Sequence, residues 1–420
     1  MLKFIKWFYP GLKIKRWISL LLIGLIFILV ASPYLSKDKH FALRMVSFLV
    51  IAVGIGAFSV GTVSLIKSFF EVIYPNKDKE LIDIIYEKRY LSKGPKIVAF
   101  GGGTGLSTIL EGLKEYTSNV AGIVTVADEG GSSGRLREEF GILPPGDIRH
   151  CLVSLAEAPQ LMRDLFQYRF QEGNGIKGHS FGNLFITAMT QVAGSFQDAV
   201  EESSKVLAIR GKVVPSSLEN IRLKAEYLDG SMKEGEDKIP KEKKPIKRIY
   251  LVPEDAKPNP LALEVIKEAD IILLGPGSLF TSILPNLLLK EIGETICRRK
   301  DIPKIYICNV MTQYGETDGF TAYEHVEALI SHIGKDIMNC CLVNCGKLEH
   351  DLLLKYSQEE SFPVILDIRR IKERNIFVFE NDVVSKTNHL RHDPYKTAKQ
   401  IINIYNYFKK TCKTLRKKSL

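Results

Sequence analysis

The chain has 420 residues, of which 45% are hydrophobic and 25% are charged, a balance typical of a folded protein with more than one core. The formal net charge is +10, and much of the excess of basic residues lies in residues 3–16 and 409–418. This distribution suits an anionic lipid surface and argues against a nucleic-acid-binding stripe. Seven cysteines without a CxxC pair fit neither a disulfide framework nor a zinc site, so a reducing compartment is expected. The cluster Cys340, Cys341 and Cys345 sits in an apolar run typical of a buried strand, and we expect no metal there.

Two apolar segments predict a membrane hairpin over residues 1–74. Trp17 to Ala31 is nearly all apolar, and Met45 to Ile66 is an uncharged run long enough to cross a bilayer. A cleaved signal peptide is the alternative for the first run, but it leaves the second unexplained. Basic residues before the first run outnumber those in the connection, so the positive-inside bias places both chain termini in the cytoplasm of a two-span membrane protein.

Glycines in the second run bear on oligomeric state. Gly54 and Gly61, with Gly56, allow close helix approach and a homodimer, although glycines are also common in membrane helices without a specific role. After the hairpin, residues 75–95 mix charges with apolar residues at helical spacing and predict an amphipathic connector. We expect a soluble α/β domain over residues 96–400 and a basic C-terminal helix or tail over residues 401–420.

A first glycine-rich loop follows a predicted short strand over residues 96–100 and leads into a predicted helix from Leu106 to Tyr116. Glycines there permit positive φ and let a phosphate approach main-chain N–H groups at a helix N-terminus. No lysine follows the last glycine, so this is not a Walker loop, and a tight turn without a ligand is the alternative. The candidate ligand residues are Gly101, Gly102, Gly103, Thr104, Gly105, Leu106 and Ser107.

A second strand is predicted over residues 122–127 and ends in Asp128 and Glu129, where a doubly wound fold often places an acid on a ribose. The polar glycine loop that follows opens another helix, and two such loops at neighbouring strand ends form a ligand crevice. The alternative is that Asp128 caps the helix while Arg135 and Arg137 face solvent. The candidates in this segment are Asp128, Ser132, Ser133 and Arg135.

Two further polar turns lead into helices predicted over residues 151–170 and 184–193. In the first, Asp147 is either a ligand contact or only a helix N-cap. In the second, residues 178–182 have the letters of a GxSxG pattern, but His179 and Ser180 are adjacent in sequence, which argues against an acyl-enzyme mechanism and leaves His179 as a ligand contact or structural donor. The candidates in these turns are Asp147, Arg149, His179, Ser180 and Asn183.

The C-terminal half repeats the strand, glycine turn, helix design. Residues 205–250 predict a β-rich edge or insertion, in which Arg210 is either a phosphate contact or part of a solvated edge. Strands over residues 271–274 and 304–308 then open onto a second anion-binding turn and an amide-rich loop suited to a base or sugar. Together these units predict a doubly wound, Rossmann-like, mostly parallel sheet. The last candidates are Gly275, Gly277, Ser278, Thr281, Ser282, Asn286, Asn309, Thr312 and Glu316.

A set of motifs resembles a known family. GGGTGLS at Gly101, GHSFGN at Gly178 and GPGS at Gly275, with GGSSGRLR, PPGDIR, NVMTQ and a closing His-Asp-Pro at His392, occur in the same order in the YvcK-like gluconeogenesis factors, relatives of 2-phospho-L-lactate transferase. The resemblance covers most of the soluble chain. It implies binding of a UDP-sugar such as UDP-N-acetylglucosamine, and a role in cell shape and envelope growth on gluconeogenic carbon sources through envelope or cell-shape proteins that the sequence does not identify.

The chain departs from the family pattern at three positions: Glu129 replaces an Asp, His150 an Asn and Tyr314 a Pro. The longer Glu129 carboxylate shifts a metal or hydroxyl contact by about one methylene, which weakens catalysis while leaving binding intact. The leading hypothesis is therefore a UDP-sugar-binding regulator without catalytic residues or a required cofactor. The alternative is a phosphoryl or nucleotidyl transferase in which Asp128, Glu129 or Asp147 holds Mg²⁺.

Overall fold

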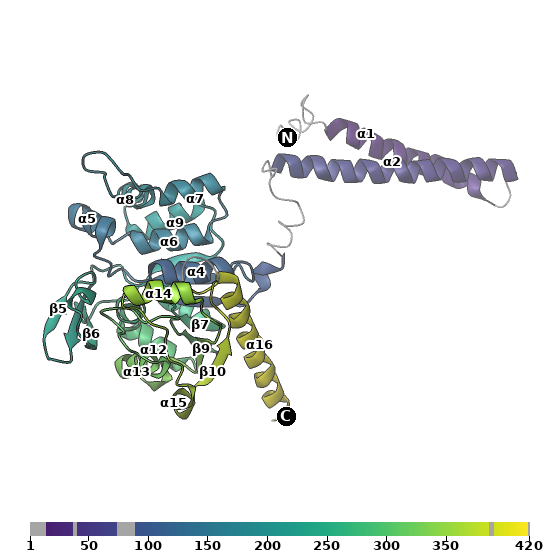
Figure 1. Cartoon of the computed structure of the whole chain (residues 1–420). Helices are drawn as coiled ribbons and strands as arrows, with labels where there is room; N and C mark the ends of the chain where they lie inside the picture. Colours follow the sequence, from purple (N-terminus) through teal and green to yellow (C-terminus); the bar gives the residue numbers. More distant parts are fainter. Residues whose placement is uncertain (1–13, 37–39, 74–88, 386–389, 419–420) are drawn as a thin grey trace. The chain divides into compact units, whose positions relative to one another are not determined.

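The computed structural model describes residues 14–36, 40–73, 89–385 and 390–418, which fall into two compact units, Met1–Ile85 and Tyr86–Leu420 (Figure 1). Most of the connector expected over residues 75–95 lies outside the described residues. Its last part contains the short 3-10 helix η3, Leu91–Lys93. The buried Leu91 side chain belongs to the second unit, in which the α/β fold begins at once.

The first unit is a helical hairpin of α1, Ile14–Ala31, and α2, Phe41–Ile73, with the short helix η2, Ser32–Leu35, after α1. Both long helices have the length and apolar composition needed to cross a membrane. A Cβ on Gly24 would lie 2.7 Å from the Gly54 carbonyl oxygen, and one on Gly61 would lie 3.0 Å from the Leu21 nitrogen. Gly54 and Gly61 therefore let α2 approach α1 within one chain, while Gly56 has open space beside it.

The second unit is built on a seven-stranded sheet in the order β10-β9-β8-β7-β1-β2-β3, and every adjacent pair is parallel. The chain adds β2 and β3 on one side of β1 and the later strands on the other, which confirms the doubly wound prediction. Ile97 pairs with both Val120 and Ile271, so β1 is the centre of the arrangement. The strands are β1, Ile97–Gly101; β2, Val120–Val124; β3, Lys212–Pro215; β7, Ile271–Leu274; β8, Lys304–Ile307; β9, Cys340–Asn344; and β10, Phe377–Asn381.

Helices cover the sheet, and α4 packs against both α6 and α16. Helices α5 to α9 form a further group beyond α4 (Figure 1). The helices are α4, Gly103–Leu113; α5, Gly131–Phe140; α6, Gly146–Leu155; α7, Gln160–Gln167; α8, Phe181–Ala193; α9, Phe196–Val206; α10, Pro260–Glu268; α11, Leu284–Leu287; α12, Lys290–Arg298; α13, Ala322–Ile333; α14, His350–Gln358; α15, Ile368–Glu373; and α16, Pro394–Lys418, with short helices η4, Pro240–Glu242; η5, Leu279–Ile283; and η6, Lys335–Ile337.

Three predicted boundaries are wrong for local reasons. The single helix expected over residues 151–170 is two helices, because Pro159 interrupts the segment after α6 ends at Leu155. The first glycine loop is itself the first turn of α4, which begins at Gly103 and not at Leu106. The strand expected over residues 122–127 is β2, which ends at Val124, so residues 125–127 already belong to the connection above the sheet.

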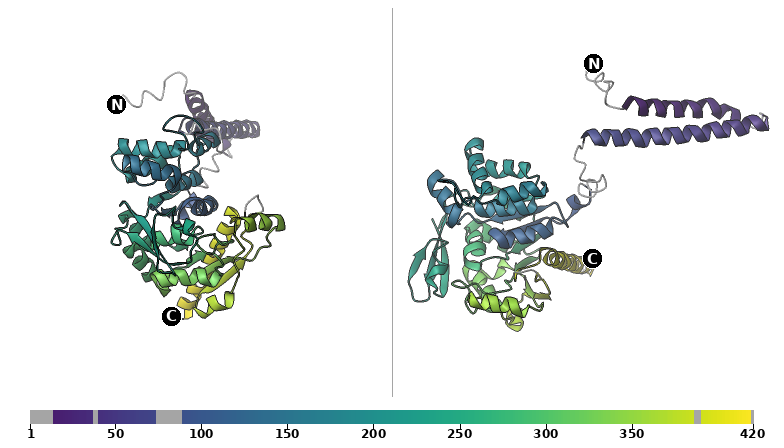
Figure 2. Two further views of the ribbon diagram at one scale, coloured as in Figure 1. Left: turned by 60° about the vertical axis from the view of Figure 1, so that its left-hand side comes forward. Right: turned by 45° about the horizontal axis from the view of Figure 1, so that its top comes forward.

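The β-rich segment expected over residues 205–250 divides between two sheets. β3 is the edge of the main sheet, whereas β4, Arg222–Tyr227, β5, Met232–Glu234, and β6, Ile246–Val252, form a separate antiparallel sheet in the order β5-β4-β6. The buried Tyr227 donates its hydroxyl proton to the Ile239 carbonyl at 2.8 Å and so holds the β5–β6 connection. This small sheet and α16 lie on opposite sides of the unit (Figure 1 and the right-hand view of Figure 2).

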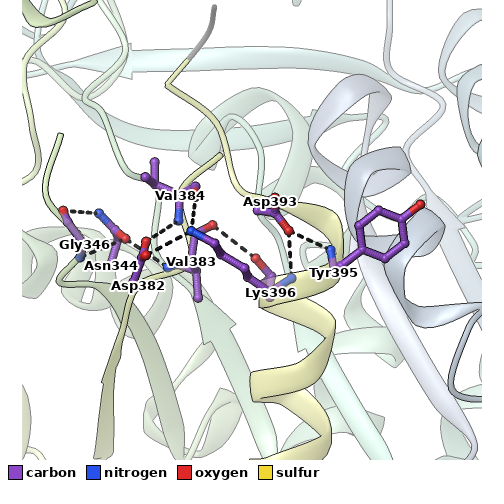
Figure 3. A network of polar contacts seen from close by, with 9 residues as sticks. Asn344, Gly346, Asp382, Val383, Val384, Asp393, Tyr395 and Lys396 are labelled. Atoms are coloured by element: carbon purple, nitrogen blue, oxygen red, sulfur yellow. Dashed lines mark hydrogen bonds and ion pairs between the residues drawn. The ribbon is translucent and has the colours of Figure 1, made fainter. Parts of the chain in front are cut away.

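Helix α16 runs through the boundary expected at residue 400, and its side chains Ala398, Ile401 and Ile404 are buried in the core. A polar network fixes its start (Figure 3). Asp393 Oδ1 accepts the Tyr395 and Lys396 N–H groups at 3.0 and 2.8 Å, while Lys396 Nζ donates to Asp382 at 2.9 Å. The residues just before Asp393 are therefore held in place.

Candidate functional site

A cavity of about 760 Å³ lies at the carboxyl ends of the central strands. Its floor consists of the turns after β1 and β7, the two strands between which the winding direction reverses, and such a switch point is where doubly wound folds bind ligands. The volume is in the usual range for a small-molecule site. Many of the predicted ligand residues line it: Gly102, Gly103, Thr104, Gly105, Asp128, Asp147, Gly277, Ser278, Thr281, Ser282, Asn309 and Thr312.

The turn after β1 packs directly on the turn after β7. A Cβ on Gly105 would lie 2.4 Å from the Pro276 carbonyl oxygen, a distance that only glycine permits. Asn286 Nδ2 donates to the Gly101 carbonyl at 3.1 Å and ties the following helix to the end of β1. The first turn of α4 lines the cavity, and its N-cap Gly102 makes no side-chain hydrogen bond. The Gly103 N–H bonds to Asp147, and the next N–H groups of this turn suit an anion.

The second turn presents hydroxyl and amide groups in fixed orientations. Asn309 Nδ2 donates to the Gly277 carbonyl at 2.8 Å, and Ser278 Oγ donates to Gln313 Oε1 at 2.6 Å. Thr281 Oγ1 donates to Glu316 Oε1 at 3.1 Å. Because both hydroxyl protons are used inside the protein, the oxygens of Ser278 and Thr281 are left as acceptors for hydroxyl or N–H groups of a ligand.

Three carboxyl groups gather on the opposite wall: Asp128, Asp147 and Glu236. Burial, reinforced by the nearby Asp128, raises the pKa of Asp147 to about 7, although the Gly103 N–H opposes the rise. Burial, followed by repulsion from Asp128 and Asp147, raises the pKa of Glu236 to about 8. Near neutral pH Glu236 is therefore mostly protonated and Asp147 about half protonated, which reduces repulsion of an anionic ligand. In the part of the chain that the structure describes, no group of three or more His, Cys, Asp or Glu side chains has the geometry of a metal site.

The alternatives left open for two of these acids can now be decided. The N-cap of α6 is Pro145, and Asp147 faces the first glycine turn, where a Cβ on Gly103 would lie 2.8 Å from its Oδ1. The N-cap of α5 is Gly130, whose N–H donates to Asp128 Oδ1 at 2.9 Å. Neither acid is merely a helix cap. Glu129 does not line the cavity and instead pairs with Arg222 at 3.3 Å.

The third wall comes from segments that the sequence interpretation did not single out. The residues that line it are Lys355 and Tyr356 of α14, Glu359 directly after this helix, Arg391 and His392. Burial lowers the pKa of His392 to about 4, so its ring is neutral, and its buried Nε2 has no hydrogen-bond partner in the described structure. Only the His-Asp-Pro motif pointed to this wall. Further lining residues that were missed are Thr108, Thr125, Glu236, Pro276, Val310, Met311, Gln313, Tyr314, Ser361 and Leu390.

Other predicted residues support the cavity without lining it. Leu106 is in the core, Ser107 Oγ donates to the Thr104 carbonyl at 3.0 Å, and Glu316 is buried behind Thr281. Gly101 is the last residue of β1, Gly275 directly follows β7, and Asn286 bonds to the Gly101 carbonyl as described above. The remaining candidates lie on the side of α5, α6 and α8: Ser132, Ser133, Arg135, Arg149, His179, Ser180 and Asn183.

Two interpretations of basic residues are corrected by their partners. Arg137 is not part of a solvated face, because it is buried and donates to the Ile221 carbonyl at 2.6 Å. Arg210 is neither a phosphate contact nor a free edge residue, since it pairs with Glu157 and donates to the Lys114 carbonyl. His179 Nδ1 lies 2.9 Å from Ser132 Oγ, which also accepts from Asn183 Nδ2 at 3.0 Å, so these three residues join α5 to α8.

The parallel sheet, its switch point and the two glycine turns define a Rossmann-like α/β protein. Residues 97–384 match the family described as 2-phospho-L-lactate transferase CofD, and the chain belongs to this family. It is 47% identical over 315 residues to the gluconeogenesis factor of Bacillus subtilis, covering 75% of this chain and 99% of that protein. A Nostoc relative is 44% identical over 421 residues, covering 95% of this chain and 92% of its own length. A crystal structure of a Bacillus halodurans protein, 47% identical, covers 74% of this chain and 100% of its own with a TM-score of 0.72.

Proposed function

We propose that this protein is a membrane-tethered, cytoplasmic regulator that binds a UDP-sugar such as UDP-N-acetylglucosamine and controls cell shape and envelope growth under gluconeogenic conditions. The observation that carries the proposal is the pairing of two glycine turns at the switch point of the sheet, beside a cavity of about 760 Å³. The relatives named gluconeogenesis factor agree with the metabolic part of the proposal.

The chemistry of the walls suits the two halves of such a ligand. The uncapped N-terminus of α4 offers N–H groups to the diphosphate, with the cations Lys355 and Arg391 on the facing wall. The oxygens of Ser278 and Thr281, oriented by Gln313 and Glu316, accept from sugar hydroxyls or the uracil N–H. The cavity thus has anion donors and hydroxyl acceptors on separate surfaces.

The membrane and regulatory parts rest on the N-terminal unit. Its two apolar helices have the length of membrane spans, and the basic residues before α1 favour an N-terminus in the cytoplasm. A ligand-binding unit attached to such a hairpin reports ligand levels at the membrane, where envelope-building proteins act. No nucleic acid is involved in this scheme.

Calorimetry with the purified protein tests the proposal. UDP-N-acetylglucosamine at millimolar concentration is expected to bind, and Ser278→Ala combined with Thr281→Val is expected to weaken binding by about tenfold, since two hydrogen bonds are lost. Ser107→Ala is the matched control, because Ser107 bonds within its own helix away from the cavity. If no UDP-sugar binds at millimolar concentration, the proposal fails.

A second candidate function is a phosphoryl or nucleotidyl transferase. The specific observation in its favour is that Asp128 and Asp147 line the cavity together with the glycine turns, where either carboxylate would hold a Mg²⁺ ion or an acceptor hydroxyl. The raised pKa of Asp147 opposes metal binding there at neutral pH, and among the described residues no group of three or more His, Cys, Asp or Glu side chains has the geometry of a metal site, so we rank this function second. Incubation with nucleotide-activated donors and Mg²⁺ decides the matter: release of mononucleotide would put the transferase first.

A further inference from the structure

A group of basic side chains lies away from the cavity, among α5, α6 and the connection between α7 and α8. Arg149 and His150 come from α6, Arg135 from α5, and Arg169 and His179 from the α7–α8 connection. Arg169 is close enough to both Arg149 and His150 to lower the pKa of each, and Arg135 and Arg169 act in the same way on His179. None of the five lines the large cavity.

Arg149 is buried, with 3% of its surface exposed. Its side chain makes no ion pair among the described residues, and its one hydrogen-bond partner is His150 Nε2 at 2.7 Å. A guanidinium group only donates, so His150 Nε2 must accept, and the imidazole proton is then on Nδ1. That tautomer leaves two buried donors, Arg149 Nε–H and His150 Nδ1–H, with no acceptor in the described structure.

Unpaired buried donors and an unpaired buried charge are costly, and native proteins rarely keep them without a ligand. The surrounding charge is also unbalanced. The carboxyl groups that act on these side chains are Glu139, on His179, and Asp147, on Arg149, and the pKa of Asp147 is raised to about 7. Arg135 and Arg169 are exposed. Arg135 donates one hydrogen bond to the Lys177 carbonyl and Arg169 donates one to the Gly178 carbonyl, which fixes the loop and leaves their other N–H groups open to solvent.

We propose that Arg149, His150 and Arg169, with Arg135 at the edge, form a second anion site that takes a phosphoryl group, separate from the large cavity. A dianionic phosphate matches the excess of guanidinium groups, and its oxygens accept the two buried donors. Access is from the exposed Arg135 and Arg169 side. The shared ligand chemistry is a phosphate, either free or at the end of a small metabolite.

The test measures the melting temperature and calorimetric affinity of the full chain with inorganic phosphate. Arg169→Ala is expected to lower phosphate affinity at least tenfold, whereas Arg163→Ala on α7, which removes the same charge outside the group, changes it less than twofold. Equal phosphate responses in these two variants would overturn the proposal. The proposal is also overturned if saturating UDP-N-acetylglucosamine abolishes the part of the phosphate response that Arg169→Ala removes, because the phosphate would then bind in the cavity.

A second variant separates ligand binding from a structural role. Arg149→Met keeps the length of the side chain and removes the unpaired charge. We expect its melting temperature without phosphate to equal or exceed that of the unchanged protein, and its phosphate-dependent increase to disappear. A lower melting temperature together with an unchanged phosphate response would show that Arg149 only supports the fold. Glucose 6-phosphate used in place of inorganic phosphate tells a metabolite site from a free-phosphate site.

Discussion

The raised pKa values of Asp147 and Glu236 make stability fall as pH rises, a direction opposite to that expected for carboxylates held in ion pairs. Glu236 holds its proton up to about pH 8 in the folded chain, against an ordinary pKa of 4.5. The folded state therefore binds more protons than the unfolded state between these values, and the free energy of unfolding falls as pH rises through them. Glu236→Gln keeps the shape of the protonated side chain and removes this ionisation.

The size of the effect follows from the shift. One pKa unit corresponds to about 1.4 kcal/mol, so the rise of Glu236 from 4.5 to about 8 sets an upper limit of roughly 5 kcal/mol for the cost of ionising it in the folded state. The group is half-buried and repelled by two neighbouring acids that relax as it ionises, so we expect about 2–4 kcal/mol. The expected gain of Glu236→Gln over the unchanged protein is that amount at pH 9 and less than about 1 kcal/mol at pH 5.

Urea unfolding of the Tyr86–Leu420 unit, followed by circular dichroism at both pH values, measures the difference. This unit corresponds to relatives that exist as whole proteins, so it is expected to fold alone. Glu219→Gln is the matched control, because Glu219 is exposed and lies outside the cavity. Parallel stability curves for Glu236→Gln and the unchanged unit between pH 5 and pH 9 would refute the reasoning.

Three further outcomes are expected. Gly103→Val places a Cβ about where Asp147 lies, at a φ of +38° that disfavours branched side chains. Calorimetry should therefore detect no UDP-sugar binding by a still folded protein. Unchanged affinity would mean that the turn has no ligand role. Asp128→Asn should weaken UDP-sugar binding by about 1.5–3 kcal/mol and leave it insensitive to Mg²⁺, whereas a wild-type affinity that requires Mg²⁺, lost in this variant, would favour the transferase. A reporter fused after Leu420 should read cytoplasmic and membrane-bound, and removal of residues 1–74 should release a soluble domain; a reporter on the far side of the membrane contradicts the hairpin.

The sequence was most informative where short-range patterns decide the structure. Strand β7 begins and ends where the apolar run Ile271 to Leu274 does, because a strand buried on both faces needs an unbroken apolar segment. The parallel doubly wound sheet followed from the repeated strand, glycine turn, helix units. The predicted starts of α4 and α5 differ from the observed ones, because these helices begin at Gly103 and Gly131. Both glycines have positive φ within the first helical turn, and in a sequence they are typical of loops.

The site was predictable only in part, because its walls come from distant segments. The glycine turns carry their own signal, but Glu236 lies in a charged run that resembles a solvated edge, and its place in the cavity depends on how the β5–β6 connection folds back. Lys355 and Tyr356 belong to an amphipathic helix with no distinctive motif. Arg149 was predicted as a cavity residue because its motif adjoins Asp147. Residues two positions apart on a helix point in different directions, however, and the structure brings Arg149 beside His150 and Arg169.

The close contact between Gly105 and Pro276 has a consequence for how ligand preference can change in this family. Because the Pro276 carbonyl occupies the space that a side chain at position 105 would need, the first turn cannot gain a side chain there unless the second turn moves, so the two turns of the floor are coupled. The rim is different: α14, residues 390–392 and the β5–β6 connection reach the cavity from separate elements. Such an arrangement keeps the common part of a ligand fixed and lets selection alter what is bound next to it, or whether anything reacts there.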